Sequence, residues 1–179
     1  MNPVDVSIIV TFQEQRSQLN QLLPVLLSQH YDGEYEVIAV DMMHDKDTEE
    51  WLEEMEIHYP QLRHTFCPAS SRGIDIFKLA FTLGAKSAIY EWLVIMPADI
   101  VLPSEDWLNC LMACCSDEVD LVIGTTSPKS FWSRLKSKMS RRRQSIFNLT
   151  SSIFLCRRSI LLQGTSHIPN KRLIRLPFE

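Results

Sequence analysis

Hydrophobic residues follow two alternating spacings along the chain as far as residue 124. Short apolar runs rich in β-branched residues, such as Asp5–Phe12 and Tyr35–Val40, are followed by segments in which apolar residues recur every three or four positions, as at Leu19, Leu22 and Leu23. The runs predict buried strands, and the spaced residues predict amphipathic helices. The predicted strands cover residues 5–12, 35–40, 62–66, 92–96 and 120–124.

Polar residues and prolines mark the ends of the predicted helices. Asp47 and Glu50 form a D-x-x-E pattern that predicts the start of the second helix, and Pro60 is expected to end it. Ser104 is expected to cap the helix that follows the strand at 92–96. Because strands and helices alternate five times, the pattern predicts an α/β fold with a mainly parallel sheet and helices on both faces.

The pattern changes after Gly124. Only residues 152–156 predict a further strand, and the chain from Gly164 onward gives little signal. We therefore expect a main part at residues 1–125 and a short basic extension of the same domain at residues 126–179.

The C-terminal third is strongly basic. Residues 1–120 hold 21 acidic and 6 basic side chains, whereas residues 121–179 hold 1 acidic and 12 basic ones. Basic residues and helically spaced apolar residues share the stretch Phe131–Arg143, so Arg134–Arg143 is a candidate for contact with an anionic membrane surface. The alternative is a solvated segment that packs against the acidic remainder of the chain. Nucleic acid is not expected as a partner, because no nucleic-acid-binding module accompanies the charge.

Missing motifs exclude several classes of protein. The five glycines form neither G-x-x-x-x-G-K-[ST] nor G-x-G-x-x-G, and no H-E-x-x-H or G-x-S-x-G occurs. These absences argue against Walker ATPases, typical dinucleotide oxidoreductases, metalloproteases and α/β-hydrolases. No apolar run approaches the roughly 18 residues of a membrane-spanning helix, and the five irregularly spaced cysteines predict reduced thiols rather than a zinc site. We expect a cytoplasmic protein, attached peripherally to the inner face of the membrane if the basic segment binds lipid.

Polar residues at predicted strand ends are the candidates for a functional site, because ligands of an open parallel sheet bind beyond the carboxyl ends of its strands. Asp41 and Asp99 follow two of the predicted strands, and Arg72 lies in the loop before the third helix. A carboxylate in such a place can hold a ribose hydroxyl or a divalent metal on phosphates. The alternatives are that the aspartates cap helices or form turns, and that Arg72 is a solvated loop residue.

Two stretches of the chain resemble a known family. The sequences VSIIVTFQEQRSQLNQLLPVLLSQHYDGEYEVIAVD and YEWLVIMPADIVLPSEDWL, the second preceded by LAFTLGAKSAI, resemble the N-terminal half of family 2 glycosyltransferases over about residues 4–125. The resemblance implies the GT-A nucleotide-sugar-binding fold, a UDP- or GDP-sugar as donor, and a cell-envelope or polysaccharide acceptor.

The resemblance also implies roles for single residues. Thr11 and Phe12 would line the nucleoside pocket, and Asp41 would begin the family's V-D-D motif. Arg72 would lie near the diphosphate, and Asp99 would end the D-x-D motif and hold Mn²⁺ or Mg²⁺. The metal would stabilise the charge that develops on the departing nucleoside diphosphate.

Departures from the family's pattern favour a second hypothesis. The second Asp of V-D-D is Met42, the first Asp of D-x-D is Pro97, and no acidic residue occurs between Asp120 and Glu179, where relatives carry the general base. An inverting transfer needs such a base to accept a proton, and no catalytic residue can be named. The alternative to an active transferase is therefore an impaired GT-A domain that acts as a binding or partner subunit of another glycosyltransferase.

Overall fold

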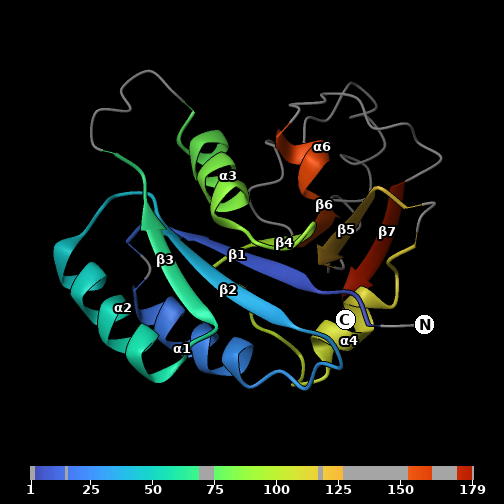
Figure 1. Cartoon of the computed structure of the whole chain (residues 1–179), viewed down its shortest axis with the longest axis horizontal. Coiled ribbons are helices and arrows are strands. Elements are labelled where there is room, and N and C mark those ends of the chain that lie inside the picture. The colour runs from blue at the N-terminus through green and yellow to red at the C-terminus, as the bar shows by residue number, and fades with distance from the viewer. Residues whose placement is uncertain are drawn as a thin grey trace.

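A seven-stranded sheet forms the centre of the molecule in the computed structural model (Figure 1). The structure describes residues 3–14, 16–68, 75–116, 119–126, 153–162 and 173–178. The strands are β1 (Val6–Phe12), β2 (Tyr35–Asp41), β3 (Leu62–Phe66), β4 (Trp92–Pro97), β5 (Leu121–Thr126), β6 (Ile153–Arg157) and β7 (Leu173–Phe178). The helices are α1 (Arg16–Leu27), α2 (Lys46–His58), α3 (Ile76–Ser87), α4 (Trp107–Met112) and α6 (Arg158–Leu162).

The strand order is β3-β2-β1-β4-β6-β5-β7. Strand β6 runs antiparallel to β4 and β5, and the other pairs are parallel, which confirms a mainly parallel sheet. The strand at 120–124 does not pair with the strand at 92–96, because β6 pairs with both and separates them. A buried apolar run of the kind seen in β6 carries no information on strand direction or neighbours.

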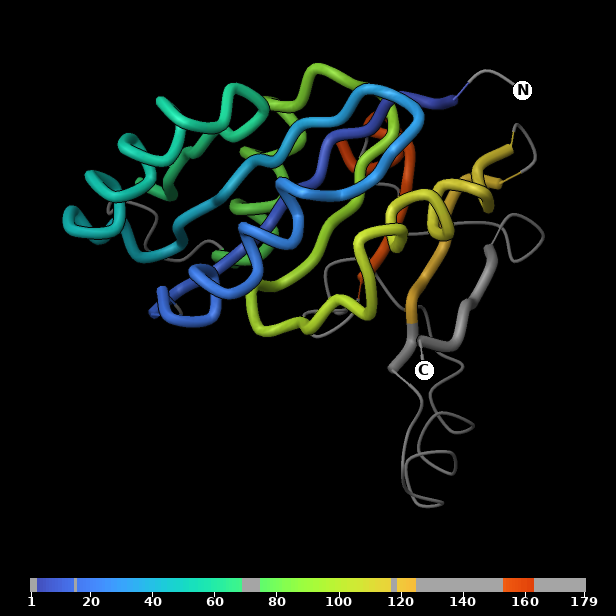
Figure 2. The backbone as a smooth tube through the Cα atoms, turned by 90° about the horizontal axis from the view of Figure 1, so that it is seen from below, coloured from blue at the N-terminus to red at the C-terminus, as the bar shows by residue number. Residues whose placement is uncertain are grey.

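Helices cover both faces of the sheet, as predicted. Helices α1, α2 and α4 pack on one face, where Leu23 and Leu108 share a core with Ile8 of β1. Helices α3 and α6 pack on the other face, where Phe81 shares a core with Ile9. Figure 2 looks onto the face covered by α1, α2 and α4. Since successive strand residues point to opposite faces and both faces are covered, β1 is buried along its whole length, and its central residues Ile8, Ile9 and Val10 are apolar.

Helix α2 begins earlier than the D-x-x-E pattern at Asp47 predicts. Its N-cap is Asp45, whose Oδ2 accepts the backbone N–H of Thr48 at 3.0 Å. Asp47 lies within the first turn, where its charge favours the helix dipole without forming the cap. The predicted helix start at Asp47 is therefore wrong. The local sequence pattern that corresponds to the observed cap is D-x-x-T at residues 45–48.

Helix α4 is capped from a distant part of the chain and not by Ser104, as we expected. The helix starts at Trp107, and Ser104 contributes only its backbone carbonyl, which accepts the N–H of Trp107 at 3.4 Å. The N–H of Leu108 donates instead to Oε1 of the buried Gln29 at 2.9 Å. Nε2 of Gln29 donates to the Ser104 carbonyl at 3.1 Å. A side chain from beyond α1 thus satisfies a terminal N–H of α4, which local sequence cannot reveal.

A buried carboxylate fastens the amino-terminal ends of the strands. Oε1 of Glu36 in β2 accepts the hydroxyl of Ser7 at 2.6 Å and the backbone N–H of Ile89 at 2.8 Å. Its Oε2 accepts Nε–H of Arg63 in β3 at 3.0 Å. Glu36 is 4% exposed, so these bonds compensate its desolvation and lock β1, β2 and β3 together.

No helix among the described residues has both the length and the apolar character needed to cross a bilayer.

Candidate functional site

The carboxyl ends of β1, β2 and β4 meet at one edge of the sheet. Phe12 lies opposite Asp41 of β2, and Thr11 lies opposite Pro97 of β4. The chain proceeds from β1 outward to β2 and β3 and then returns to β4 on the other side of β1. The order of the strands therefore reverses between β1 and β4, and open α/β sheets bind ligands in the crevice beyond such a reversal.

The side chains of Thr11 and Phe12 are buried at this edge, with 3% and 1% of their surface exposed. Their backbone carbonyls hold the neighbouring loops: that of Thr11 accepts the N–H of Ala98 at 3.1 Å, and that of Phe12 accepts the N–H of Met42 at 2.9 Å. The structure thus places both residues at the edge, where their role in lining a nucleoside pocket stays a prediction.

Asp41 organises the loop between β2 and α2. Its Oδ1 accepts the backbone N–H of Met43 and its Oδ2 that of Asp45, each at 2.8 Å. The residue is 4% exposed. This is the turn-forming role that we set against ligand binding for a strand-end aspartate. Each carboxylate oxygen keeps a second acceptor site, so hydrogen bonding to a ribose stays compatible with this geometry.

An aromatic pair that the sequence analysis missed borders the same edge. His44 adopts a left-handed backbone conformation with φ of 56°. Its ring stacks on Phe66 at the end of β3, with centroids 3.7 Å apart and planes at 2°. Met42 is buried in the core under α3, whereas Met43 is 57% exposed beside the pair. Met42 therefore cannot present a polar group to a base, whereas Met43 is exposed and His44 is partly exposed in the same loop.

Asp99 lies in the loop after β4 and lines a cavity of about 260 Å³. The cavity lies between that loop and α1, which contributes Gln18 and Gln21. Thr11, Phe12 and Asp41 are not among its lining residues. Asp99 therefore shares this cavity with two glutamines of α1, and Asp41 does not line it.

Asp99 fits a divalent cation that bridges phosphates. Magnesium-like ions commonly use one or two carboxylates, keep several waters and take their remaining oxygens from the substrate. Pro97 supplies no carboxylate at the start of P-A-D, so Asp99 is the carboxylate that this motif offers. Arg72 and the basic stretch Phe131–Arg143 lie outside the described residues.

The buried thiols of Cys67 and Cys115 are poorly suited to act as nucleophiles. Burial, followed by the nearby charge of Asp41, raises the pKa of the Cys67 thiol to about 11. Burial likewise raises the pKa of Cys115 to about 12. Thiols with such pKa values are protonated at neutral pH and react slowly.

The fold agrees with comparisons to known proteins. The chain matches the family described as Glycosyl transferase family 2 over residues 7–175, and it belongs to this family. The match confirms the resemblance noted from the sequence. No curated protein matches the chain by sequence.

Solved structures share the fold. The mannosyltransferase PcManGT from Pyrobaculum calidifontis, in complex with GDP-Man and Mn²⁺, is 18% identical with a TM-score of 0.70, covering 99% of this chain and 55% of its own. S. aureus TarS 1-349 is 16% identical with a TM-score of 0.64, covering 97% of this chain and 58% of its own. The same S. aureus protein in complex with UDP-GlcNAc gives a TM-score of 0.54 at 19% identity, covering 69% of this chain and 34% of its own. The chain has the GT-A fold of these glycosyltransferases and spans little more than half the length of the first two.

Proposed function

We propose that the chain binds a UDP- or GDP-sugar and transfers the sugar to a cell-envelope or polysaccharide acceptor. The observation that carries the proposal is the family match over residues 7–175 on a sheet whose order reverses between β1 and β4. The solved relatives support a nucleotide-sugar donor, because their complexes hold GDP-Man or UDP-GlcNAc.

Asp99 would hold Mn²⁺ or Mg²⁺ on the diphosphate of the donor. The metal supplies positive charge that stabilises the departing nucleoside diphosphate. The chain's own residues position the donor: Asp41 fixes the loop that begins with Met42, and Thr11 fixes the start of the loop that carries Asp99. Arg72 would neutralise a further phosphate charge.

A second candidate function is a GT-A domain that binds a nucleotide sugar without transferring the sugar. It is favoured by Pro97 in place of the first Asp of D-x-D and by the absence of any acidic residue between Asp120 and Glu179. Without an acceptor base the transfer loses a contribution of typically 10²- to 10⁴-fold in rate. Such a domain would serve as a partner subunit of an active transferase, and the basic Arg134–Arg143 would attach it to an anionic membrane surface.

Binding titrations test the proposal. We would titrate the purified chain with UDP, GDP, UDP-GlcNAc and GDP-Man, with and without Mn²⁺. At least one nucleotide is expected to bind, more tightly with Mn²⁺, and Asp99→Ala is expected to remove the effect of the metal. Asp106→Ala is the matched control, since Asp106 is an exposed carboxylate near α4 outside the cavity, and it should retain that effect. Failure of every nucleotide to bind would contradict both candidate functions, whereas binding without transfer would favour the second.

A further inference from the structure

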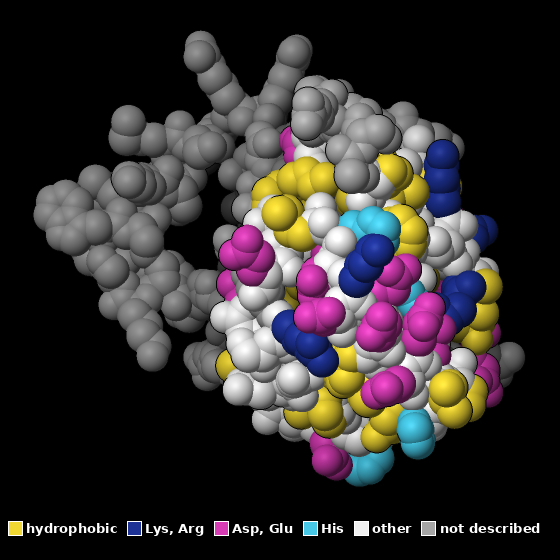
Figure 3. Space-filling model, turned by 90° about the vertical axis from the view of Figure 1, so that its left-hand side faces the viewer, with side chains coloured by type: hydrophobic (Ala, Val, Ile, Leu, Met, Phe, Trp, Pro, Cys, Tyr) yellow, Lys and Arg dark blue, Asp and Glu magenta, His cyan; other side chains and the backbone are white. Residues whose placement is uncertain are grey.

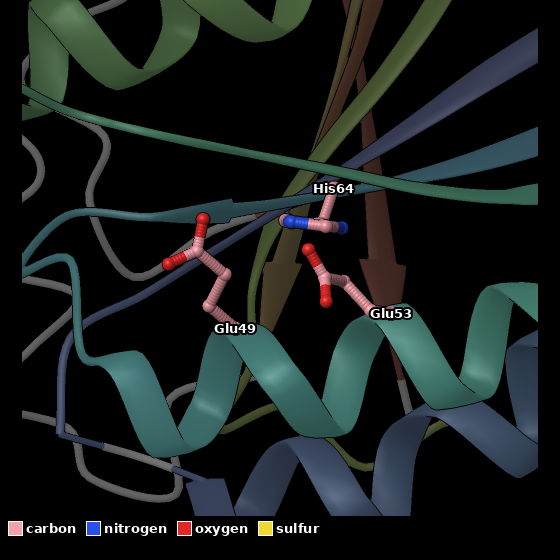
Figure 4. A group of neighbouring side chains, drawn as sticks. All are labelled: Glu49, Glu53 and His64. Carbon is pink, nitrogen blue, oxygen red and sulfur yellow. The ribbon is translucent and has the colours of Figure 1, made fainter.

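Two carboxylates and one imidazole converge between α2 and β3. Glu49 and Glu53 project from α2 toward His64 of β3 (Figure 4), and their ligand atoms all lie within 4.8 Å of one another. Figure 3 looks onto this side of the molecule, where acidic side chains and histidines gather with a few lysines and arginines among them. We propose that Glu49, Glu53 and His64 bind a divalent transition metal of the zinc class.

A hydrogen bond orients the imidazole ligand. Nδ1 of His64 lies 2.7 Å from Oε1 of Glu56, one turn further along α2. A histidine that donates Nδ1–H to a carboxylate presents the lone pair of Nε2, and metal-binding histidines are commonly held in this way. The His64 side chain is 14% exposed, so packing between helix and strand limits its motion. Glu56 is therefore a positioning residue for His64.

Charge makes a cation favourable at this place. Glu49, Glu53 and Glu56 follow one another at spacings of four and three residues, so their carboxylates share one stripe of α2 and repel one another. Within the described part of the chain, the other ionisable groups found close to these carboxylates are histidines: His44 lies 3.3 Å from Glu49, and His64 lies 2.7 Å from Glu56. An imidazole offsets the negative charge only when it is protonated. A bound divalent cation would offset two of the three negative charges of this stripe.

The donor set selects the class of metal. One imidazole nitrogen and two carboxylate oxygens suit Zn²⁺, which binds three protein ligands and leaves a fourth position to water. Mg²⁺ and Ca²⁺ prefer oxygen ligands alone. The site is distinct from Asp99, because β3 lies three positions from β4 in the sheet, or about 14 Å at the usual spacing between strands. Metal held here would fasten α2 to β3, the edge strand.

Zinc binding to the full chain tests the proposal. We would measure it in a Cys110→Ser, Cys114→Ser background, because these thiols are exposed or partly exposed and would compete for Zn²⁺. We expect one Zn²⁺ per chain by calorimetry, together with a rise in melting temperature. Glu53→Gln should weaken Zn²⁺ binding at least about tenfold. Loss of even an outer-shell partner of a metal ligand typically costs about 10- to 100-fold in affinity. Because Glu53 is exposed, this variant should keep the circular dichroism spectrum of the parent. A second variant, His64→Gln, should also lose Zn²⁺ binding, but Glu53→Gln alone is a sufficient test if His64→Gln does not fold.

Two controls separate this site from others. Glu54→Gln removes one carboxylate from the same helix, but residue 54 lies about 140° around the helix from residue 49, so it should bind Zn²⁺ like the parent. Asp99→Ala should also bind Zn²⁺ like the parent. Absence of Zn²⁺ binding, or equal affinity in Glu53→Gln and the parent, would overturn the proposal without affecting the proposed nucleotide site.

Discussion

Asp41 and Asp45 are joined by a hydrogen bond of 2.8 Å, which the backbone N–H of Asp45 donates to Oδ2 of Asp41. Asp41 ends β2, and Asp45 caps α2. The two aspartates therefore set the course of the four-residue connection that borders the carboxyl end of β1. The stacked pair of His44 and Phe66 holds the same connection against the end of β3. Hydrogen bonds to Asp41 and the His44–Phe66 stack therefore fix the conformation of this connection.

The cap of α2 should depend on pH. The hydrogen bonds of Thr48 to Asp45 lower the pKa of the Asp45 carboxyl below its ordinary value of 3.8. A lowered pKa in the folded state stabilises the protein above the unfolded pKa, and this contribution is lost as the pH falls through the folded pKa. We expect Asp45→Ala to lower the free energy of unfolding in urea by more at pH 7 than at about pH 3.

Asp47→Ala is the control for the cap, because the D-x-x-E pattern predicts Asp47 as the start of the helix. It should lower the free energy of unfolding less than Asp45→Ala at pH 7, since Asp47 lies in the first turn and does not form the cap. Equal losses in the two variants would show that the cap has been assigned to the wrong residue.

Glu36 should be one of the most sensitive polar positions in the sheet. Glu36→Ala removes an acceptor shared by Ser7, Arg63 and the N–H of Ile89. We expect a loss of about 2 kcal/mol in the free energy of unfolding, because a buried donor that loses its acceptor costs about 1–3 kcal/mol. Glu34→Ala, an exposed neighbour, should change it by no more than about 0.5 kcal/mol. A loss below about 1 kcal/mol for Glu36→Ala would mean that water replaces the carboxylate.

Helix α3 approaches β1 closely at Gly84. A Cβ at this position would lie 2.6 Å from Cγ2 of the fully buried Ile9. Alanine improves helix propensity by about 1 kcal/mol, but overpacking a rigid core costs about 1–3 kcal/mol, so Gly84→Ala should be destabilising in urea unfolding. In an Ile9→Ala background the clash is removed, and Gly84→Ala should then be neutral or stabilising. A penalty that persisted in this background would rule out Ile9 as the cause.

The basic stretch Phe131–Arg143 should attach the protein to anionic membranes. Each of its six basic residues contributes up to about 1 kcal/mol near such a surface. We expect co-sedimentation with vesicles rich in phosphatidylserine but not with neutral vesicles, weakening as salt shortens the Debye length below about 8 Å. Replacing Arg141, Arg142 and Arg143 by Ser should release the protein without unfolding it. No binding at low salt would indicate that the segment instead balances the acidic part of the chain.

The sequence predicted those features that depend on local pattern. Ile8 and Ile9 face opposite cores, which is why consecutive apolar residues occur at the centre of β1. The first four strands lie where such runs predict them. The place of β6 between β4 and β5 and the strand β7 could not be predicted, because strand pairing depends on partners distant in sequence.

The candidate site was predicted less completely than the fold. Asp41, Thr11 and Phe12 lie at the predicted edge because parallel strands end together there. The cluster around His64 was missed, since it requires the pairing of β3 with β2 beneath α2. Its one local signal was the spacing of Glu49, Glu53 and Glu56 on α2, which is also typical of a solvated helix face.

Anomalous diffraction can show whether Asp99 holds a metal on a bound nucleotide. Crystals of the chain would be grown with Mn²⁺ and the UDP or GDP nucleotide that binds best, and data collected at the manganese absorption edge. We expect an anomalous peak within coordination distance of the Asp99 carboxylate, with the diphosphate beside it and the nucleoside beyond the carboxyl ends of β1 and β2. A nucleotide bound elsewhere, or manganese absent from Asp99 when the nucleotide is present, would contradict this expectation.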